Sequence, residues 1–139
     1  MLIGIDPLLT PELLHALASM GHGDTIALVD ANYPASRGKR LIRLPGVTVA
    51  AALRATLTVL PLDDQEKAAQ AMLPAGDAVP AAVAEINAVL AASGARPAAG
   101  LGRHEFYAAA EQAYAIVATG ERRRFGNVFL VKGVVAADG

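Results

Sequence analysis

The first apolar repeat in the chain has the spacing of a helix. Large apolar side chains recur at intervals of three and four residues in the stretch "TPELLHALASMG", at Leu13, Leu14, Leu17 and Met20. This spacing places them on one face of a helix. Thr10 can cap the free amides at the helix start, and Pro11 suits the first helical position. We therefore predict a helix from residue 11 that ends at Gly21, where glycine permits a left-handed stop.

Other apolar runs are continuous and short, which favours buried strands. The run "TIALV" predicts a strand from Thr25 to Val29 that ends at Asp30. Further strands are expected at 40–44 and 58–62, and the runs at 114–119 and 127–135 predict two more. The last two runs flank a polar turn, "GERRRFG".

The segments between these runs have helical composition. Helices are predicted at 48–57, 64–73, 80–93 and 103–113, with a loop in the glycine-rich stretch 94–102. Strands that alternate with helices favour an α/β fold whose central sheet is parallel or mixed. We expect a single compact domain over residues 1–139, with the central sheet flanked by helices.

Composition narrows the class of protein. Of the 139 residues, 54% are hydrophobic and 18% are charged, which is a globular composition. A small-residue chain with so little charge suggests buried subunit interfaces. The net charge of −1 argues against nucleic-acid or anionic-membrane partners. No apolar stretch approaches a membrane span and no secretory signal is evident, so we expect a cytoplasmic protein.

Several kinds of site are disfavoured by the residue types present. The chain has no cysteine, which excludes disulfides, thiol catalysis and thiolate metal sites. The pattern GxSxG of a nucleophile elbow is absent, as are the glycine-rich loops of nucleotide-binding proteins. No histidine pair has helical metal-ligand spacing, so we expect no metal. The basic run Arg122–Arg124 suits either a solvated turn or an anion or partner site.

Two residues near the first predicted strand are candidates for chemistry. His22 lies between glycines in "GHGD", and a histidine with its ordinary pKa of about 6.5 can exchange protons near neutral pH. It could equally serve as a cation at the end of the preceding helix. Asp30 ends a strand, where ligands of α/β sheets usually bind, although it could simply begin a turn.

Three segments together resemble a known family. The stretches "GIDPLLTPELLHALASMGHGDTIALVDANYPA" and "RHEFYAAAEQAYAIVATGERRRFGN", with the ending "LVKGV", resemble the fucose mutarotase / ribose pyranase family. The resemblance runs from Met1 to Val134, and GHGD with DANYPA places the chain nearer the fucose branch. It implies a fold of that family, a cofactor-independent isomerase acting on a free monosaccharide, and a homo-oligomer, typically a ring-shaped decamer with sites near subunit contacts.

The resemblance also implies roles for individual residues. His22 matches the proton-donating histidine, and Asp30 and Arg103 match sugar-binding positions. The segment Phe125, Gly126 and Asn127 matches a sugar-binding segment that usually begins with tyrosine. We expect His22 and Asp30 to face one pocket; whether a neighbouring subunit contributes to it stays open.

Phe125 departs from the family pattern because it lacks the tyrosine hydroxyl. Tyr33, Tyr107 and Tyr114 are candidates to replace that hydroxyl. The departure favours one alternative to a fucose mutarotase, a non-catalytic monosaccharide-binding or regulatory protein. A ribose pyranase or other sugar pyranase and an assembly scaffold are two further alternatives.

Overall fold

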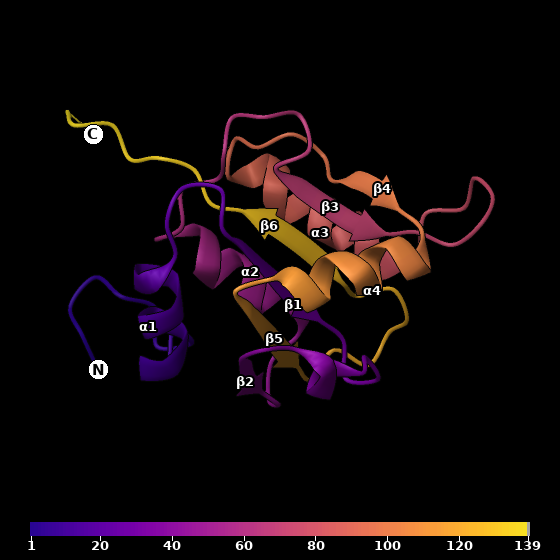
Figure 1. The fold of residues 1–139 in the computed structure, drawn as a ribbon, viewed down its shortest axis with the longest axis horizontal. Coiled ribbons are helices and arrows are strands. Elements are labelled where there is room, and N and C mark those ends of the chain that lie inside the picture. The colour runs from indigo at the N-terminus through magenta and orange to yellow at the C-terminus, as the bar shows by residue number, and fades with distance from the viewer. Residues whose placement is uncertain (139) are drawn as a thin grey trace.

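The computed structural model describes residues 1–138, and its framework is one mixed six-stranded sheet (Figure 1). The strand order is β2-β5-β1-β6-β3-β4. The strands are β1 (Thr25–Val29), β2 (Leu41–Leu44), β3 (Ala69–Met72), β4 (Ala99–Leu101), β5 (Ala115–Thr119) and β6 (Val128–Val131). β6 runs antiparallel to its neighbours β1 and β3, and the other neighbouring strands are parallel. The expected α/β fold with a mixed central sheet is confirmed.

Four α-helices and one 3₁₀ turn accompany the sheet. They are α1 (Pro11–Ser19), η1 (Ala35–Arg37), α2 (Val49–Leu57), α3 (Ala81–Ala92) and α4 (Arg103–Gln112). The side chain of Thr10 accepts from the Leu13 amide and caps α1, and Thr48 caps α2 in the same way. None of the helices in residues 1–138 combines the length and apolarity needed to cross a membrane.

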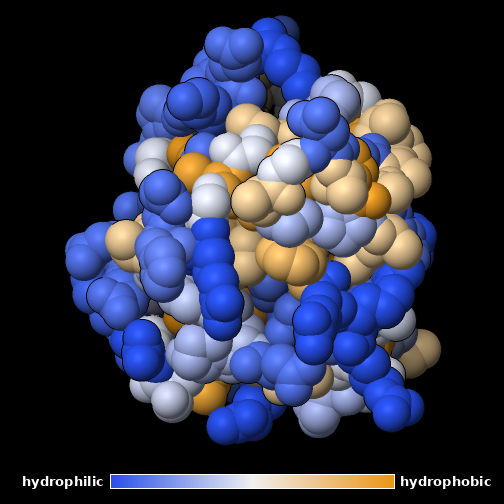
Figure 2. Space-filling model, turned by 90° about the vertical axis from the view of Figure 1, so that its right-hand side faces the viewer, coloured by the Kyte–Doolittle hydropathy of each residue, from blue (hydrophilic) through white to orange (hydrophobic). Residues whose placement is uncertain are grey.

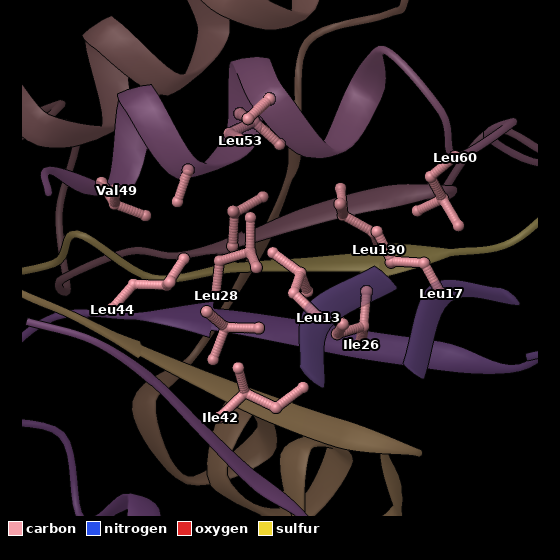
Figure 3. Close-up of a cluster of buried hydrophobic side chains, with 14 of the residues drawn as sticks. Leu13, Leu17, Ile26, Leu28, Ile42, Leu44, Val49, Leu53, Leu60 and Leu130 are labelled. Atoms are coloured by element: carbon pink, nitrogen blue, oxygen red, sulfur yellow. The ribbon is translucent and has the colours of Figure 1, made fainter. Parts of the chain in front are cut away.

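β1 is buried on both faces because helices pack against each side of the sheet there. Ile26 and Leu28 pack with α1, α2 and α3 in the larger hydrophobic core, part of which Figure 3 shows. Ala27 and Val29 point the other way and pack with Phe106 of α4 in a second core. The continuous apolar sequence of β1 thus reflects burial on two faces rather than one.

Two predictions in the middle of the chain are wrong. Residues 58–62 do not form a strand: the amides of residues 58–60 donate back to the carbonyls of Ala55 and Thr56, and Leu62 makes only an isolated bridge to Lys132. Residues 64–73 do not form a helix, because Ala69–Met72 pair as β3 between β6 and β4. Pairing on both sides overrides the helix preference of Ala, Gln and Met.

The loop predicted over 94–102 contains a short strand. β4 (Ala99–Leu101) pairs with β3 at one edge of the sheet. Gly21 is not the left-handed residue after α1; Gly23 is, with φ +87°. The Gly21 amide instead donates to Asp24 Oδ2 at 2.7 Å, and the Asp24 amide donates back to the Gly21 carbonyl.

Candidate active site

A pocket of about 570 Å³ lies beyond the carboxyl ends of β1 and β3, where β6 begins. Figure 2 looks toward the right-hand end of the sheet in Figure 1, where hydrophobic residues form a band between hydrophilic regions. Four of the six residues to which the family resemblance gave roles line the pocket: Asp30, Arg103, Phe125 and Asn127. They come from β1, α4 and the loop before β6, so the fold brings together positions up to 97 residues apart.

Asp30 and Asn127 form the floor of this arrangement. The Asp30 amide donates to Asn127 Oδ1 at 2.9 Å, and Asn127 Nδ2 donates to Asp30 Oδ2 at 3.2 Å. The Asn32 amide donates to the other carboxylate oxygen at 3.0 Å. Both residues are buried, so these bonds fix the carboxylate in one orientation with lone pairs left to accept from a ligand hydroxyl.

Burial raises the pKa of Asp30 above its ordinary value, and hydrogen bonds from Asn32 and Asn127 oppose that rise. The carboxyl therefore holds a proton more readily than a carboxyl in water. A pocket carboxyl of this kind can both accept hydrogen bonds from a sugar and take part in proton transfer.

The loop between β5 and β6 is anchored by Glu121. This side chain is buried, and its carboxylate accepts from the main-chain amide, Nε and Nη2 of Arg123. Its main-chain carbonyl accepts from the Ala31 amide, which follows Asp30. The bond from Ala31 ties the loop to the end of β1. The bonds from Arg123, chiefly those of its side chain, lower the pKa of Glu121.

The same loop ends in a constrained turn. Phe125 has φ +61°, a left-handed conformation that costs a non-glycine residue energy. Gly126 does not line the pocket; a Cβ there would lie 2.5 Å from Glu121 Cγ, so only glycine fits. The turn places the Phe125 ring and the Asn127 amide on the pocket wall.

α4 contributes a second anchored pair. Arg103 and Tyr107 lie one helical turn apart, and Arg103 Nε donates to the Tyr107 hydroxyl at 3.2 Å. The Tyr107 ring packs edge-on against Tyr33, with centroids 5.3 Å apart. Burial raises the pKa of Tyr33 to about 12, so its hydroxyl stays protonated at neutral pH.

Of the three tyrosines considered as substitutes for the missing hydroxyl, Tyr33 and Tyr107 line the pocket. Tyr114 does not line it and lies beneath the Arg40 guanidinium, 4.0 Å from the ring centroid. Sequence reasoning missed Asn32 and Met72 as lining residues, and it identified Arg124 only as part of a basic run suited to a solvated turn or to an anion or partner site. Asn32 is part of the DANYPA segment and could have been found there, whereas Met72 lies in the segment mistaken for a helix.

His22 lies at the other end of β1. The five residues of β1 separate it from Asp30 by about 17 Å of strand. The expectation that both residues face one pocket is therefore wrong within a single chain. The His22 side chain is 62% exposed, and its Nε2 lies 3.2 Å from Asp63 Oδ1.

Asp63 is well placed to orient the imidazole of His22. Its carboxylate also accepts from the Gln65 amide, and these two partners, Gln65 first, lower the pKa of Asp63. A carboxylate bonded to one ring nitrogen sets the tautomer and leaves the other nitrogen for chemistry. Across residues 1–138, no three histidine or acidic side chains are grouped so as to hold a metal ion.

Comparison with known proteins identifies the family. The model of the RbsD / FucU transport protein family matches residues 3–135. This chain belongs to that family. It is 42% identical to L-fucose mutarotase of a Haemophilus influenzae strain, over 96% of this chain and 97% of that protein.

Solved structures of the family share the fold. A fucose mutarotase from Streptococcus pneumoniae, in complex with L-fucose, superposes with a TM-score of 0.91 at 38% identity, covering 97% of this chain and all of that one. Bacillus subtilis RbsD, complexed with D-ribose, has a TM-score of 0.79 at 21% identity, covering 98% of this chain and 100% of that chain. The ribose-bound protein thus shows the fold alone, and the resemblance in sequence is to fucose mutarotases.

Proposed function

We propose that this protein is a mutarotase that interconverts the anomers of a free monosaccharide by acid/base catalysis without a cofactor. L-Fucose is the leading candidate substrate. The observation that carries the proposal is the Asp30–Asn127 pair at the floor of a pocket of sufficient size, in a chain 38–42% identical to fucose mutarotases. The lower identity of the ribose-bound relative makes a ribose pyranase the second candidate.

Ring opening and ring closure each need two proton transfers, and neither needs a redox step. One group removes the proton from the anomeric hydroxyl while another delivers a proton to the ring oxygen, and the bond between C1 and the ring oxygen breaks. The aldehyde then rotates, and the hydroxyl released by ring opening attacks its other face. That hydroxyl loses its proton, the carbonyl oxygen gains one, and the other anomer forms. A positioned acid or base contributes about 10²–10⁴-fold to such a step.

The pocket residues divide this work. The Asp30 carboxylate accepts from a sugar hydroxyl, and its position is fixed by Asn127 and Asn32. Arg103 donates to further hydroxyls while its Nε is held by Tyr107. The Phe125 ring packs against the sugar, and Tyr33 or Tyr107 supplies the hydroxyl that Phe125 lacks.

We further propose that His22 acts as the acid/base in the pocket of a neighbouring subunit. Within one chain His22 lies at the opposite end of β1 from Asp30, and it is exposed with Asp63 beside it. Both chain termini lie at the left of Figure 1 and carry exposed apolar side chains, including Leu2, Ile3, Val134 and Val135. Such exposed apolar side chains support a contact between subunits near His22. A ring-shaped homo-oligomer requires contacts of this kind, and we propose that the ring is a decamer.

NMR measurement of anomer exchange tests the function directly. L-fucose and D-ribose are each followed with and without protein, using saturation transfer between anomeric protons. Faster exchange of fucose with little effect on ribose supports the mutarotase. Faster exchange of ribose ring forms instead would identify a pyranase, and ligand binding without faster exchange would identify a binding protein. No effect on either sugar would contradict all of these functions and leave an assembly scaffold as the remaining alternative.

A further inference from the structure

The pocket contains more positive than negative side chains. Arg103 and Arg124 both line it, and Asp30 is its single acidic lining residue. In residues 1–138, no carboxylate lies within 4 Å of either guanidinium. Arg123 is the contrast, because its guanidinium lies 2.8 Å from Glu85 and 2.9 Å from Glu121. Two of the arginines around this loop and α4 thus face the pocket without an acidic partner.

The acidic groups nearby are engaged elsewhere. Asp30 is hydrogen-bonded by Asn127 and by the Asn32 amide. The Glu105 carboxylate folds back over the start of α4, where a Cβ on Gly102 would collide with it, and it does not line the pocket. In the proposed oligomer, the neighbouring subunit places its His22 and Asp63 at the pocket. Asp63 is already in contact with His22.

Arg103 is already oriented for an anion. Its Nε donates to the Tyr107 hydroxyl, which leaves the edge formed by its two Nη groups without a partner in the hydrogen bonds of residues 1–138. Two parallel N–H groups match the two oxygens of a carboxylate. A side chain held in place before the ligand arrives loses less conformational entropy on binding.

There is also room next to the pocket. Arg103 and Phe125 line a second, adjoining cavity of about 570 Å³ whose other walls include Leu73, Pro74 and Leu101. Arg103 lines both cavities and Arg124 lines the first, so a sugar ring over Asp30 and Asn127 has room for a substituent that extends along Arg103.

We propose that the pocket accepts hexuronates, monosaccharides in which C6 is a carboxylate, and that Arg103 and Arg124 bind this carboxylate. The inference rests on the proposed mutarotase function and extends its substrate class. The bond changes stay at C1 and the ring oxygen, and the C6 carboxylate takes part only in binding. A hexuronate neutralises the pocket, whereas a neutral sugar leaves a guanidinium without a counter-charge.

Sugars that differ only at C6 test this inference. L-Fucose, L-galactose and L-galacturonate carry a methyl, hydroxymethyl and carboxylate group there, and D-galactose with D-galacturonate forms a second series. Anomer exchange by NMR gives kcat/KM for each sugar. In at least one series we expect kcat/KM for the carboxylate to exceed that of its hydroxymethyl partner by about tenfold or more.

Two variants connect the preference to Arg124. Arg124→Met should lower the ratio of carboxylate to neutral kcat/KM by about 10- to 100-fold, the worth of a charged hydrogen bond. Arg122→Met removes the same charge from an exposed side chain outside the pocket and should leave the ratio unchanged. Raising the salt from about 0.02 M to about 0.5 M should reduce the ratio in the wild type, because salt screens exposed charges.

The outcomes separate the two proposals. Exchange of neutral sugars with no preference for a carboxylate in either series overturns the hexuronate inference and leaves the mutarotase standing. A carboxylate preference that persists in Arg124→Met also overturns it, since Arg124 would not be the binding group. Exchange of none of the sugars contradicts the mutarotase itself.

Discussion

Asp30 and Asn127 bind each other through two hydrogen bonds, with the Asp30 amide donating to Asn127 Oδ1 and Asn127 Nδ2 donating to Asp30 Oδ2. The pair joins the first residue after β1 to the residue just before β6. Because β1 and β6 are antiparallel neighbours, the two residues meet at the same end of the sheet. The pocket floor thus depends on the register between these strands.

Replacing Asn127 should damage both stability and catalysis. Asn127→Ala leaves the buried Asp30 amide without its acceptor and frees the carboxylate to turn. We expect a loss of about 1–3 kcal/mol in the free energy of unfolding and a fall in kcat/KM for anomer exchange of about 100-fold. Urea unfolding and NMR exchange measure the two effects.

Asn87 offers a matched control for that variant. Its Oδ1 also accepts from a backbone amide, that of Ala98, at 2.9 Å, but it lies outside the pocket. Asn87→Ala should therefore cost stability without changing exchange. If Asn127→Ala left exchange as fast as Asn87→Ala does, the Asp30–Asn127 pair would have no part in the reaction.

Glu121 should make stability depend on acid pH. Its pKa is lowered below the ordinary 4.5, chiefly by the side chain of Arg123. The native carboxylate therefore stabilises the fold fully above pH 4.5, and this contribution is lost as pH falls through the lowered native pKa. Glu121→Gln should cost about 1–2 kcal/mol at neutral pH, toward the low end because Arg123 is 41% exposed.

The pH dependence of that cost is the decisive measurement. The gap in unfolding free energy between the wild type and Glu121→Gln should shrink as pH falls below 4.5. Glu85→Gln is the control, because Glu85 contacts the same arginine but is 43% exposed, so its removal should cost less than about 0.5 kcal/mol. A gap that stays constant or grows in acid would contradict the role given to Glu121.

The left-handed backbone of Phe125 should reverse the usual order of alanine and glycine. Phe125→Gly should be more stable than Phe125→Ala by about 1 kcal/mol, because alanine keeps the strain at φ +61° and glycine does not. At the exposed helical position Ala108, replacement by glycine should instead cost about 0.5–1 kcal/mol. Thermal or urea unfolding of these variants would refute the strain if Phe125→Ala proved the more stable.

The sequence predicted those parts of the fold that local pattern controls. α1 and α2 have threonine caps and periodic apolar faces, and β1 is a continuous apolar run, so each was found close to its observed bounds. The apolar run at 127–135 also predicted a strand, but only Val128–Val131 form β6. β3 and β4 were missed because their sequences, rich in alanine, glycine and glutamine, acquire strand structure only from pairing with each other and with β6.

The site residues recognisable from local sequence were predicted, whereas their arrangement in space was not. Asp30 was identified because it ends a strand, and Arg103, Phe125 and Asn127 because they match family segments. The prediction that His22 and Asp30 face one pocket was wrong within a single chain. The two residues are close along the sequence, but they lie at opposite ends of β1. The run Arg122–Arg124 was predicted to be either a solvated turn or an anion or partner site. The sequence of three arginines does not reveal that the middle one pairs with Glu121 while the last lines the pocket.

Mixing two inactive variants tests most directly that His22 and the Asp30 pocket act together across a subunit contact. His22→Ala and Asp30→Asn should each lose L-fucose exchange while still assembling. When the two are unfolded together and refolded as mixed rings, some contacts pair an intact His22 with an intact Asp30. In a random equal mixture, about a quarter of the contacts hold both intact residues. We therefore predict that exchange returns to about a quarter of the wild-type rate, since a positioned acid or base is needed at each working site. Mixed rings as inactive as the separate variants would contradict a site shared between subunits.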